Sequence, residues 1–247
     1  MKIKKEAAIG IIIVFVFLTG ITGIMIHRKN RNREDLAVRV AALSGGPPST
    51  VEGLRSAIAA YEKQIEQHVK DAAQLGVYWK ILAVRLQDQG LHNEALTALE
   101  RAIYFTPEDR ALHYMTGVSA GFAAKNIHSF PGVDSSERDR YFALAEEGYL
   151  RAIEIDDRYL RPRYGIAVLY VFELDRPAEA IPHLLKCLEL SGNDTDAMFV
   201  LGRAYYMTGA FKEAVEVYDR IIGTTKDGQK QTEARNNRQL VMERLYG

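Results

Sequence analysis

The chain has 247 residues, enough for one extended domain or two small ones. It carries 32 Lys and Arg residues against 32 Asp and Glu residues, and this balance gives no support for nucleic-acid binding, which usually leaves a basic excess on one face. A single cysteine, Cys187, excludes an internal disulfide and any multi-cysteine zinc or iron–sulfur site. The abundance of Ala, Leu and Glu, with only 7 prolines, favours helices.

The chain begins with an uncharged apolar run, Ala7–Ile26, preceded by three lysines. At about 1.5 Å per residue a helix over this run spans the roughly 30 Å hydrocarbon core of a bilayer. The run is longer than a signal-peptide core of about 7–15 residues, and no small-residue cleavage site follows it. We therefore predict an uncleaved single-pass anchor over residues 1–27 that contacts the lipid bilayer. A basic juxtamembrane tether over residues 28–48 follows it.

The orientation of this predicted anchor stays open. Basic residues favour the cytoplasmic side, and the segment after the run carries slightly more of them than the segment before it. A short basic start followed by a long apolar run resembles an export signal, which favours the opposite orientation. Thr19 and Gly23 form a pair of small residues, four positions apart, that would permit weak self-association of two anchors.

An amphipathic helix is predicted over residues 49–75. Ser49 and Glu52 have the spacing of a capping box at its start. Apolar residues then recur at steps of three and four, which gives the helix one apolar face. We expect this helix to cover the open edge of the segment that follows. The apolar positions are Leu54, Ile58, Tyr61, Ile65, Ala72 and Leu75.

The rest of the chain repeats a two-helix pattern. The segments "WKILAVRLQDQGLHNEALTALERAIYFTP" and "MFVLGRAYYMTGAFKEAVEVYDRII" share a large residue, then Leu with a small residue, then Gly before a turn. An alanine opens each second helix, and Ala95, Ala145, Ala180 and Ala214 lie 50, 35 and 34 residues apart. The spacing predicts four units, the second lengthened by an insertion at 125–139, and a final capping helix over 228–246. The units lie near 76–109, 110–159, 160–194 and 195–227.

The first unit resembles the tetratricopeptide repeat (TPR) family, whose 34-residue pattern is W-x₂-L-G-x₂-Y followed by A-x₃-F, A and P. The resemblance implies an all-α solenoid of about four helix pairs with flanking helices, here preceded by one transmembrane helix. The whole chain is similar to bacterial single-pass membrane-anchored TPR proteins, which implies a location in the bacterial cell membrane. The matching positions are Trp79, Leu82, Ala83, Leu86, Gly90, Ala95, Leu99, Ala102 and Pro107.

One competing motif is G-x-S-x-G at Gly117–Gly121, the pattern of a hydrolase nucleophile elbow. That motif requires a strand before the serine, and the sequence before Ser119 reads as a helix. Gly117 also takes the small position of its repeat, where a small side chain permits close helix packing. His183 and Cys187 are four residues apart, but Cys187 likewise occupies a small packing position. We predict no enzymatic activity, no cofactor and no metal site.

The resemblance also implies a concave groove lined by the first helix of each unit, with Val171 among the groove-facing positions. Lys80 matches the carboxylate clamp of chaperone-binding TPR domains, but Val84 stands where that clamp needs Asn, so a chaperone C-terminus is not the expected partner. Aromatic and arginine side chains often anchor interfaces. The predicted partner-binding residues are Tyr114, Val118, Phe122, Arg161, Tyr164, Val168, Phe172, Phe199, Arg203 and Tyr206.

These features predict a membrane-tethered TPR scaffold that mediates protein–protein interaction through an aromatic-rich groove and assists assembly or translocation of an envelope complex. The expected partner is a protein or peptide, not a nucleic acid. An alternative is a module that binds a small apolar ligand and is associated with a transporter. The insertion leaves two alternatives open: Phe130 folds over the groove, or the segment is a solvated loop.

Overall fold

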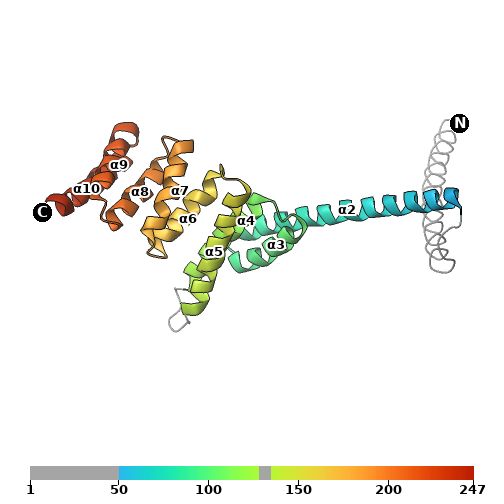
Figure 1. Cartoon of the computed structure of the whole chain (residues 1–247). Coiled ribbons are helices and arrows are strands. Elements are labelled where there is room, and N and C mark those ends of the chain that lie inside the picture. Colours follow the sequence, from blue (N-terminus) through green and yellow to red (C-terminus); the bar gives the residue numbers. More distant parts are fainter. Residues whose placement is uncertain (1–49, 128–134) are drawn as a thin grey trace, which may run out of the picture. The chain divides into compact units, whose positions relative to one another are not determined.

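The computed structural model describes residues 50–127 and 135–247. Over this part of the chain all regular elements are helices, as predicted (Figure 1). The predicted anchor and tether lie outside the described residues, as do residues 128–134 of the predicted insertion. Among the described helices, none is both long and apolar enough to cross a membrane. The helices are α2 (Val51–Asp88), α3 (His92–Phe105), α4 (Arg110–Ile127), α5 (Ser135–Ile155), α6 (Leu160–Phe172), α7 (Pro177–Leu190), α8 (Thr195–Met207), α9 (Phe211–Thr224) and α10 (Gly228–Tyr246).

The predicted separation of an edge helix at 49–75 from the first repeat is wrong, because α2 continues through that boundary as one helix. The sequence around Gly76 contains no proline or turn signal. Gly76 is a packing residue: a Cβ there would lie 2.8 Å from Cβ of Phe105. At the start of the helix the hydroxyl of Thr50 accepts the backbone N–H of Gly53 at 3.1 Å, while the predicted cap Ser49 lies outside the described residues.

The chain forms two compact units, Met1–His68 and Val69–Gly247. In the first unit the structure describes only the N-terminal part of α2. In the second unit each helix from α3 to α10 packs against its neighbours along the chain, and α4 also packs against α6, and α6 against α8. This is the arrangement of stacked helix pairs, with α4, α6 and α8 as the first helices of successive repeats (Figure 1).

Tight turns join the two helices of a repeat. Gly90 and Gly209 adopt positive φ values of 73° and 79° in the turns after α2 and α8. The turn after α6 uses Asp175 at φ 52° instead. Asp tolerates this left-handed conformation better than most residues other than Gly, because its short side chain hydrogen-bonds locally.

Small residues on one helix receive large side chains from the next. A Cβ on Gly117 would lie 2.5 Å from the Tyr149 ring, and one on Gly202 would lie 2.7 Å from the Tyr218 ring. The predicted packing role of Gly117 therefore holds. The four alanines whose spacing defined the repeats, Ala95, Ala145, Ala180 and Ala214, are all fully buried.

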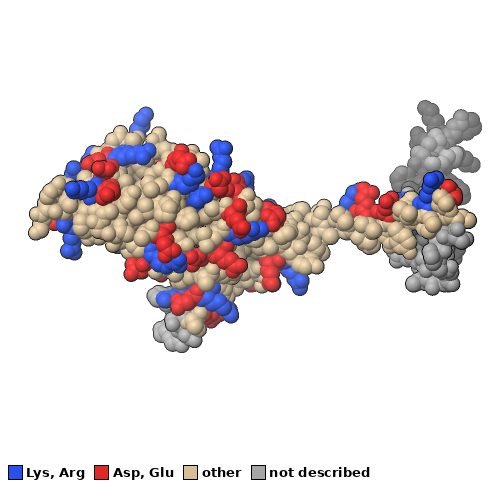
Figure 2. Space-filling model, viewed as in Figure 1, with Lys and Arg blue, Asp and Glu red and all other residues tan. Residues whose placement is uncertain are grey.

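Helix α10 closes the C-terminal end of the stack, and it begins at the residue that the spacing indicated. Asp227 caps it by accepting the backbone N–H groups of Gln229 and Lys230. Ala234 and Val241 are buried in a cluster that includes Tyr218 and Ile221 of α9. On the face shown in Figure 2, acidic and basic side chains are interspersed over the solenoid.

Candidate partner-binding site

The ten predicted partner-binding residues lie on α4, α6 and α8, the first helices of three successive repeats. None of the ten is buried. Phe122 and Phe172 are 51% and 55% exposed, which is high for phenylalanine in a folded domain. Arg161 and Arg203 are exposed as well, and the other six are half-buried. The fold therefore presents a series of accessible aromatic and basic groups along adjacent helices.

Val171 was also expected to face the groove. This prediction is wrong, because the residue is only 3% exposed. It belongs to the same core cluster as Ala180 and Leu184 of α7. The chain turns into α7 directly after Phe172, so this last turn of α6 packs beneath the connection. Of the neighbouring positions, Val168 is half-buried and Phe172 is exposed.

Contacts with neighbouring rings fix several of these aromatic side chains. The rings of Phe122 and His92 are stacked, with centroids 4.6 Å apart and planes within 8°. Burial lowers the pKa of His92, so the imidazole in this stack is neutral near pH 7. The Arg203 guanidinium lies 5.7 Å from the centroid of the Tyr206 ring. Rigid aromatic groups lose little conformational entropy when a partner binds.

Ion pairs link the first helices at their ends. Lys80 of α2 contacts Asp109, just before α4, at 2.5 Å. This ion pair engages Lys80, the residue that matched the carboxylate clamp of chaperone-binding TPR domains. Among the described residues, neither Arg161 nor Arg203 has an ion-pair partner, so both are available to a carboxylate.

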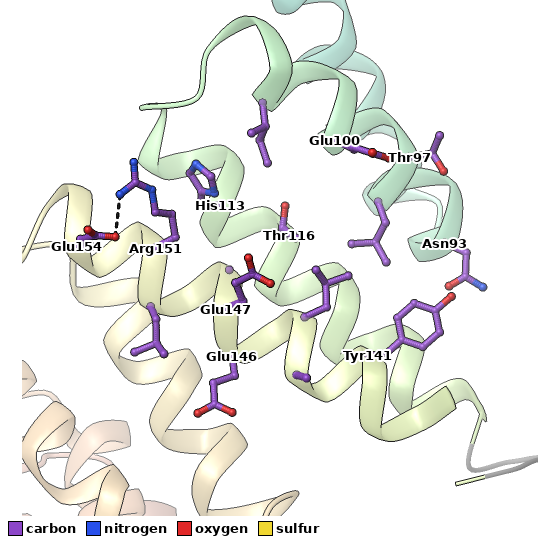
Figure 3. Close-up of a pocket in the computed structure, with 16 residues that line it drawn as sticks. Asn93, Thr97, Glu100, His113, Thr116, Tyr141, Glu146, Glu147, Arg151 and Glu154 are labelled. Atoms are coloured by element: carbon purple, nitrogen blue, oxygen red, sulfur yellow. Dashed lines mark hydrogen bonds and ion pairs between the residues drawn. The ribbon is translucent and has the colours of Figure 1, made fainter. Parts of the chain in front are cut away.

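A hollow that the sequence did not predict lies between α3 and α5 (Figure 3). It has a volume of 1180 Å³ and is walled by α3 and α5 with α4 beneath. None of the ten predicted residues lines it. Leu96 and Ile103 contribute apolar surface from α3, and Leu144 and Leu150 do so from α5. Thr116 of α4 lies between the two walls in Figure 3.

Carboxylates surround this hollow, and two of them, Glu146 and Glu154, pair with arginine side chains. Arg151 contacts Glu154 and Glu108, each at 2.7 Å. Glu146 accepts a hydrogen bond from the Tyr170 hydroxyl at 2.8 Å and pairs with Arg176 at 3.0 Å. Burial and this hydrogen bond raise the pKa of Tyr170 well above its usual value.

Gly148 lines the hollow where α5 closely approaches α4. Its backbone approaches α4 so closely that a Cβ would lie 2.8 Å from the backbone nitrogen of Gly117 and 2.8 Å from the carbonyl oxygen of His113. The hollow was missed because its residues come from three helices in two repeats. No sequence signal marked it, because the lining residues lie in ordinary helical stretches and not in the insertion.

The sequence raised two chemical alternatives, a nucleophile at Ser119 and a site at His183 and Cys187, and the structure explains Ser119 and Cys187 by packing. Ser119 lies inside α4, fully buried, and its hydroxyl accepts a hydrogen bond from Nε2 of Gln87 at 2.7 Å. No strand precedes it in α4, so the G-x-S-x-G match is not a nucleophile elbow. Burial raises the pKa of the Cys187 thiol to about 11, as expected of a packed cysteine. Within residues 50–127 and 135–247 no cluster of metal-ligating side chains occurs.

Comparison with known proteins agrees with this architecture. Residues 171–231 match the family model described as tetratricopeptide repeat. A TPR repeat-containing protein of Borreliella burgdorferi is 23% identical over 195 residues, which are 78% of this chain and 83% of that relative. The solved TPR protein YrrB is 20% identical, with a TM-score of 0.54, over 74% of this chain and 81% of its own.

A thermophilic TPR protein of Thermus thermophilus superposes with a TM-score of 0.52 at 18% identity, over 84% of this chain and 97% of its own. At these identities the solved structures show a shared fold. The family model identifies tetratricopeptide repeat sequence over residues 171–231, and the solved structures show that the described part of the chain has the all-α solenoid fold of TPR proteins. This fold is typical of scaffolds that bind proteins or peptides.

Proposed function

We propose that this protein is a membrane-tethered scaffold that binds an extended peptide segment of a partner protein along α4, α6 and α8. The observation that carries the proposal is the row of accessible aromatic and arginine side chains on three successive first helices. Aromatic rings supply apolar contact area, while Arg161 and Arg203 supply charge for a carboxylate or a backbone carbonyl. The preferred ligand is thus an apolar or aromatic segment with an acidic residue.

The comparisons support peptide binding as the general activity. YrrB is described as a TPR protein with an unusual peptide-binding site, and it shares the fold of this chain. The apolar run Ala7–Ile26 supports tethering to a membrane, and the following basic segment suits anionic lipid headgroups. A tethered scaffold of this kind is suited to assembly or translocation complexes of the cell envelope.

The test is affinity capture of the full-length protein from solubilised native membranes, compared with a Tyr164→Ala/Phe172→Ala variant. The matched control is Leu185→Ala, which removes an apolar side chain that is 47% exposed on α7, away from the proposed surface. Circular dichroism checks that all three proteins are equally helical. We expect the double variant to lose its partners and the control to keep them.

Capture of the same proteins by the double variant would overturn the proposed surface. Native mass spectrometry of the purified protein addresses the alternative function. A bound small apolar molecule that disappears in the double variant, with no partner protein captured, would favour a ligand-binding module instead.

A further inference from the structure

The N-terminal part of α2 carries an uncovered apolar stripe. Val51, Leu54, Ile58, Tyr61 and Ile65 are between 42% and 67% exposed. Of all 38 residues in α2, the buried ones are Gly76 and Ala83, both in its C-terminal half. Helices in water gain most of their stability from packing an apolar face, so this half of α2 requires a partner that the described residues do not supply.

The spacing of the stripe is that of a coiled coil. With Val51 at heptad position a, the a positions continue with Ile58 and Ile65, and Leu54 and Tyr61 fill the d positions. A repeat of apolar a and d positions every seven residues is the pattern that brings two helices together by knobs-into-holes packing. In the same register the next d position is the polar residue His68, and the d positions after it are Leu75 and Leu82, which are 44% and 43% exposed.

The identity of the a and d residues indicates the occupant. All three a residues of the stripe are β-branched, and Leu54 fills one of its two d positions. β-Branched residues at a together with Leu at d favour two-stranded parallel coiled coils. A stripe with this composition is complementary to itself, so a second copy of the same helix can fill it.

The flanking positions are compatible with such a pair. In a parallel pair in register, each g residue faces the e residue five positions later on the other helix. These pairs are Thr50 with Arg55, Ala57 with Glu62, and Gln64 with Val69, and none brings like charges together. Further charged residues lie at the outer positions, as with Glu52 at b and Lys63 at f.

We propose that α2 is the interface of a homodimer, formed by parallel pairing of the Val51–Ile65 stripes of two chains. This interface is separate from the partner-binding surface on α4, α6 and α8. It is also separate from the small-residue pair of the predicted anchor. The dimer would present two solenoids, and hence two copies of the partner-binding surface.

Cysteine cross-linking of the full-length protein tests the proposal. The background is Cys187→Ala, since Cys187 is the chain's one cysteine and lies at a packed position that alanine fills elsewhere. Single cysteines are introduced at a and d, as Ile58→Cys and Tyr61→Cys, and at the outer f position, as Ser56→Cys and Lys63→Cys. A disulfide requires Cα atoms within about 7 Å, so a and d should cross-link on the order of tenfold more than f.

The outcomes separate the alternatives. A parallel pair in register cross-links at both Ile58→Cys and Tyr61→Cys. Equal yields at a, d and f positions, or no cross-link at any of them, would overturn the proposal, the latter meaning that another segment or the lipid surface covers the stripe. Gly23→Leu disables the small-residue pair of the anchor. Loss of cross-links in that variant would assign the association to the anchor and would also overturn the proposal.

Mass measurement by light scattering gives an independent result. The wild type should have twice the chain mass of 27.8 kDa. Ile58→Lys/Ile65→Lys should fall to 27.8 kDa, whereas the outer-position control Ser56→Lys should remain a dimer. A wild type that has the mass of one chain at all concentrations contradicts the proposal.

Discussion

At Gly148 the separation of α4 and α5 depends on the absence of a side chain. The atoms that a Cβ would meet belong to the α4 backbone, at Gly117 and His113, and backbone atoms cannot move aside as a flexible side chain can. Gly148 lies on α5, whereas Gly121 lies on α4. Gly121 differs from Gly148 because a Cβ there would meet nothing within 4 Å. The two glycines therefore form a matched pair for experiment.

We predict that Gly148→Ala destabilises the protein by about 1–3 kcal/mol, because overpacking forces the helices apart. Gly121→Ala should have the opposite sign and stabilise the protein by up to about 1 kcal/mol, since alanine has the higher helix propensity. Urea unfolding followed by circular dichroism measures both. Equal effects of the two substitutions on the unfolding free energy would show that the close approach of α4 and α5 does not exclude a side chain at position 148.

Asp109 links stability to pH. Burial raises its pKa, but hydrogen bonds from the Lys80 side chain and the backbone N–H groups of Ala111 and Leu112 outweigh burial and lower the pKa below 3.8. A depressed carboxyl pKa contributes stability that is complete above the unfolded-state value and is lost as pH falls through the folded-state value. The loss therefore occurs in acid, below about pH 4.

We predict that the wild type loses more unfolding free energy than Asp109→Asn between about pH 5 and pH 2. Asparagine retains the capping of α4 but neither titrates nor pairs with Lys80. Urea unfolding at a series of pH values measures the difference. Lys80→Gln serves as the control, because it removes the ion pair and keeps the capping carboxylate. Parallel pH curves for wild type and Asp109→Asn would contradict the assignment.

Some residue roles followed from sequence, and others did not. Gly117 could be assigned to packing because the same repeat position holds Ala83, Ala167 and Gly202, and the Tyr149 ring indeed lies against it. Gly148 could not be assigned, because its partner atoms belong to the backbone of another helix. Val171 was misplaced because a repeat position does not indicate how soon the following turn covers the helix.

Among the elements, α10 shows what a terminal helix contributes. It covers the apolar side of α9, where Tyr218 and Ile221 are buried together with Val241. Repeat stacks require such a terminal element, because each repeat leaves apolar surface for the next.

We predict that Val241→Ala destabilises the C-terminal repeats by about 2 kcal/mol through the lost methyl groups and the cavity left behind. Leu240→Ala is the control, because Leu240 is 57% exposed on the same helix, and its effect should stay within about 0.5 kcal/mol. Hydrogen exchange localises the effect. Amides of α9 should exchange faster and those of α4 should not, since contacts in the stack are with neighbours. Uniformly faster exchange would instead indicate one cooperative unit.

The helix boundaries show where sequence information was sufficient. The helices α4, α6 and α8 begin at Arg110, Leu160 and Thr195, as the repeat spacing predicted. The spacing works because each repeat must bury the same contacts. The break predicted before Gly76 had no such support. Helical periodicity continues unchanged through it, and a glycine facing a neighbouring helix does not end a helix.

At the scale of the whole molecule, the proposed membrane anchor would determine where the solenoid acts. We predict that the full-length protein stays with the membrane fraction after alkaline carbonate extraction. Val14→Arg/Phe17→Arg should release it, because each arginine near the centre of a membrane helix costs about 2.5–3.5 kcal/mol. The control Phe17→Leu keeps the run apolar and should remain in the membrane. A wild type found entirely in the soluble fraction would remove the tether from the proposed function.

The contacts within the solenoid also bear on how the protein is made. From α3 to α10 the described helices pack against elements that are adjacent or next-adjacent in the chain. Few contacts in this part of the chain therefore depend on a segment that is distant in sequence. Chains with such local contacts fold quickly, and domains fold as units from the N-terminal end as they leave the ribosome. Each helix pair can therefore dock as it emerges. Translation adds α10 after α9, and the growing end presents a bare apolar surface until α10 is complete.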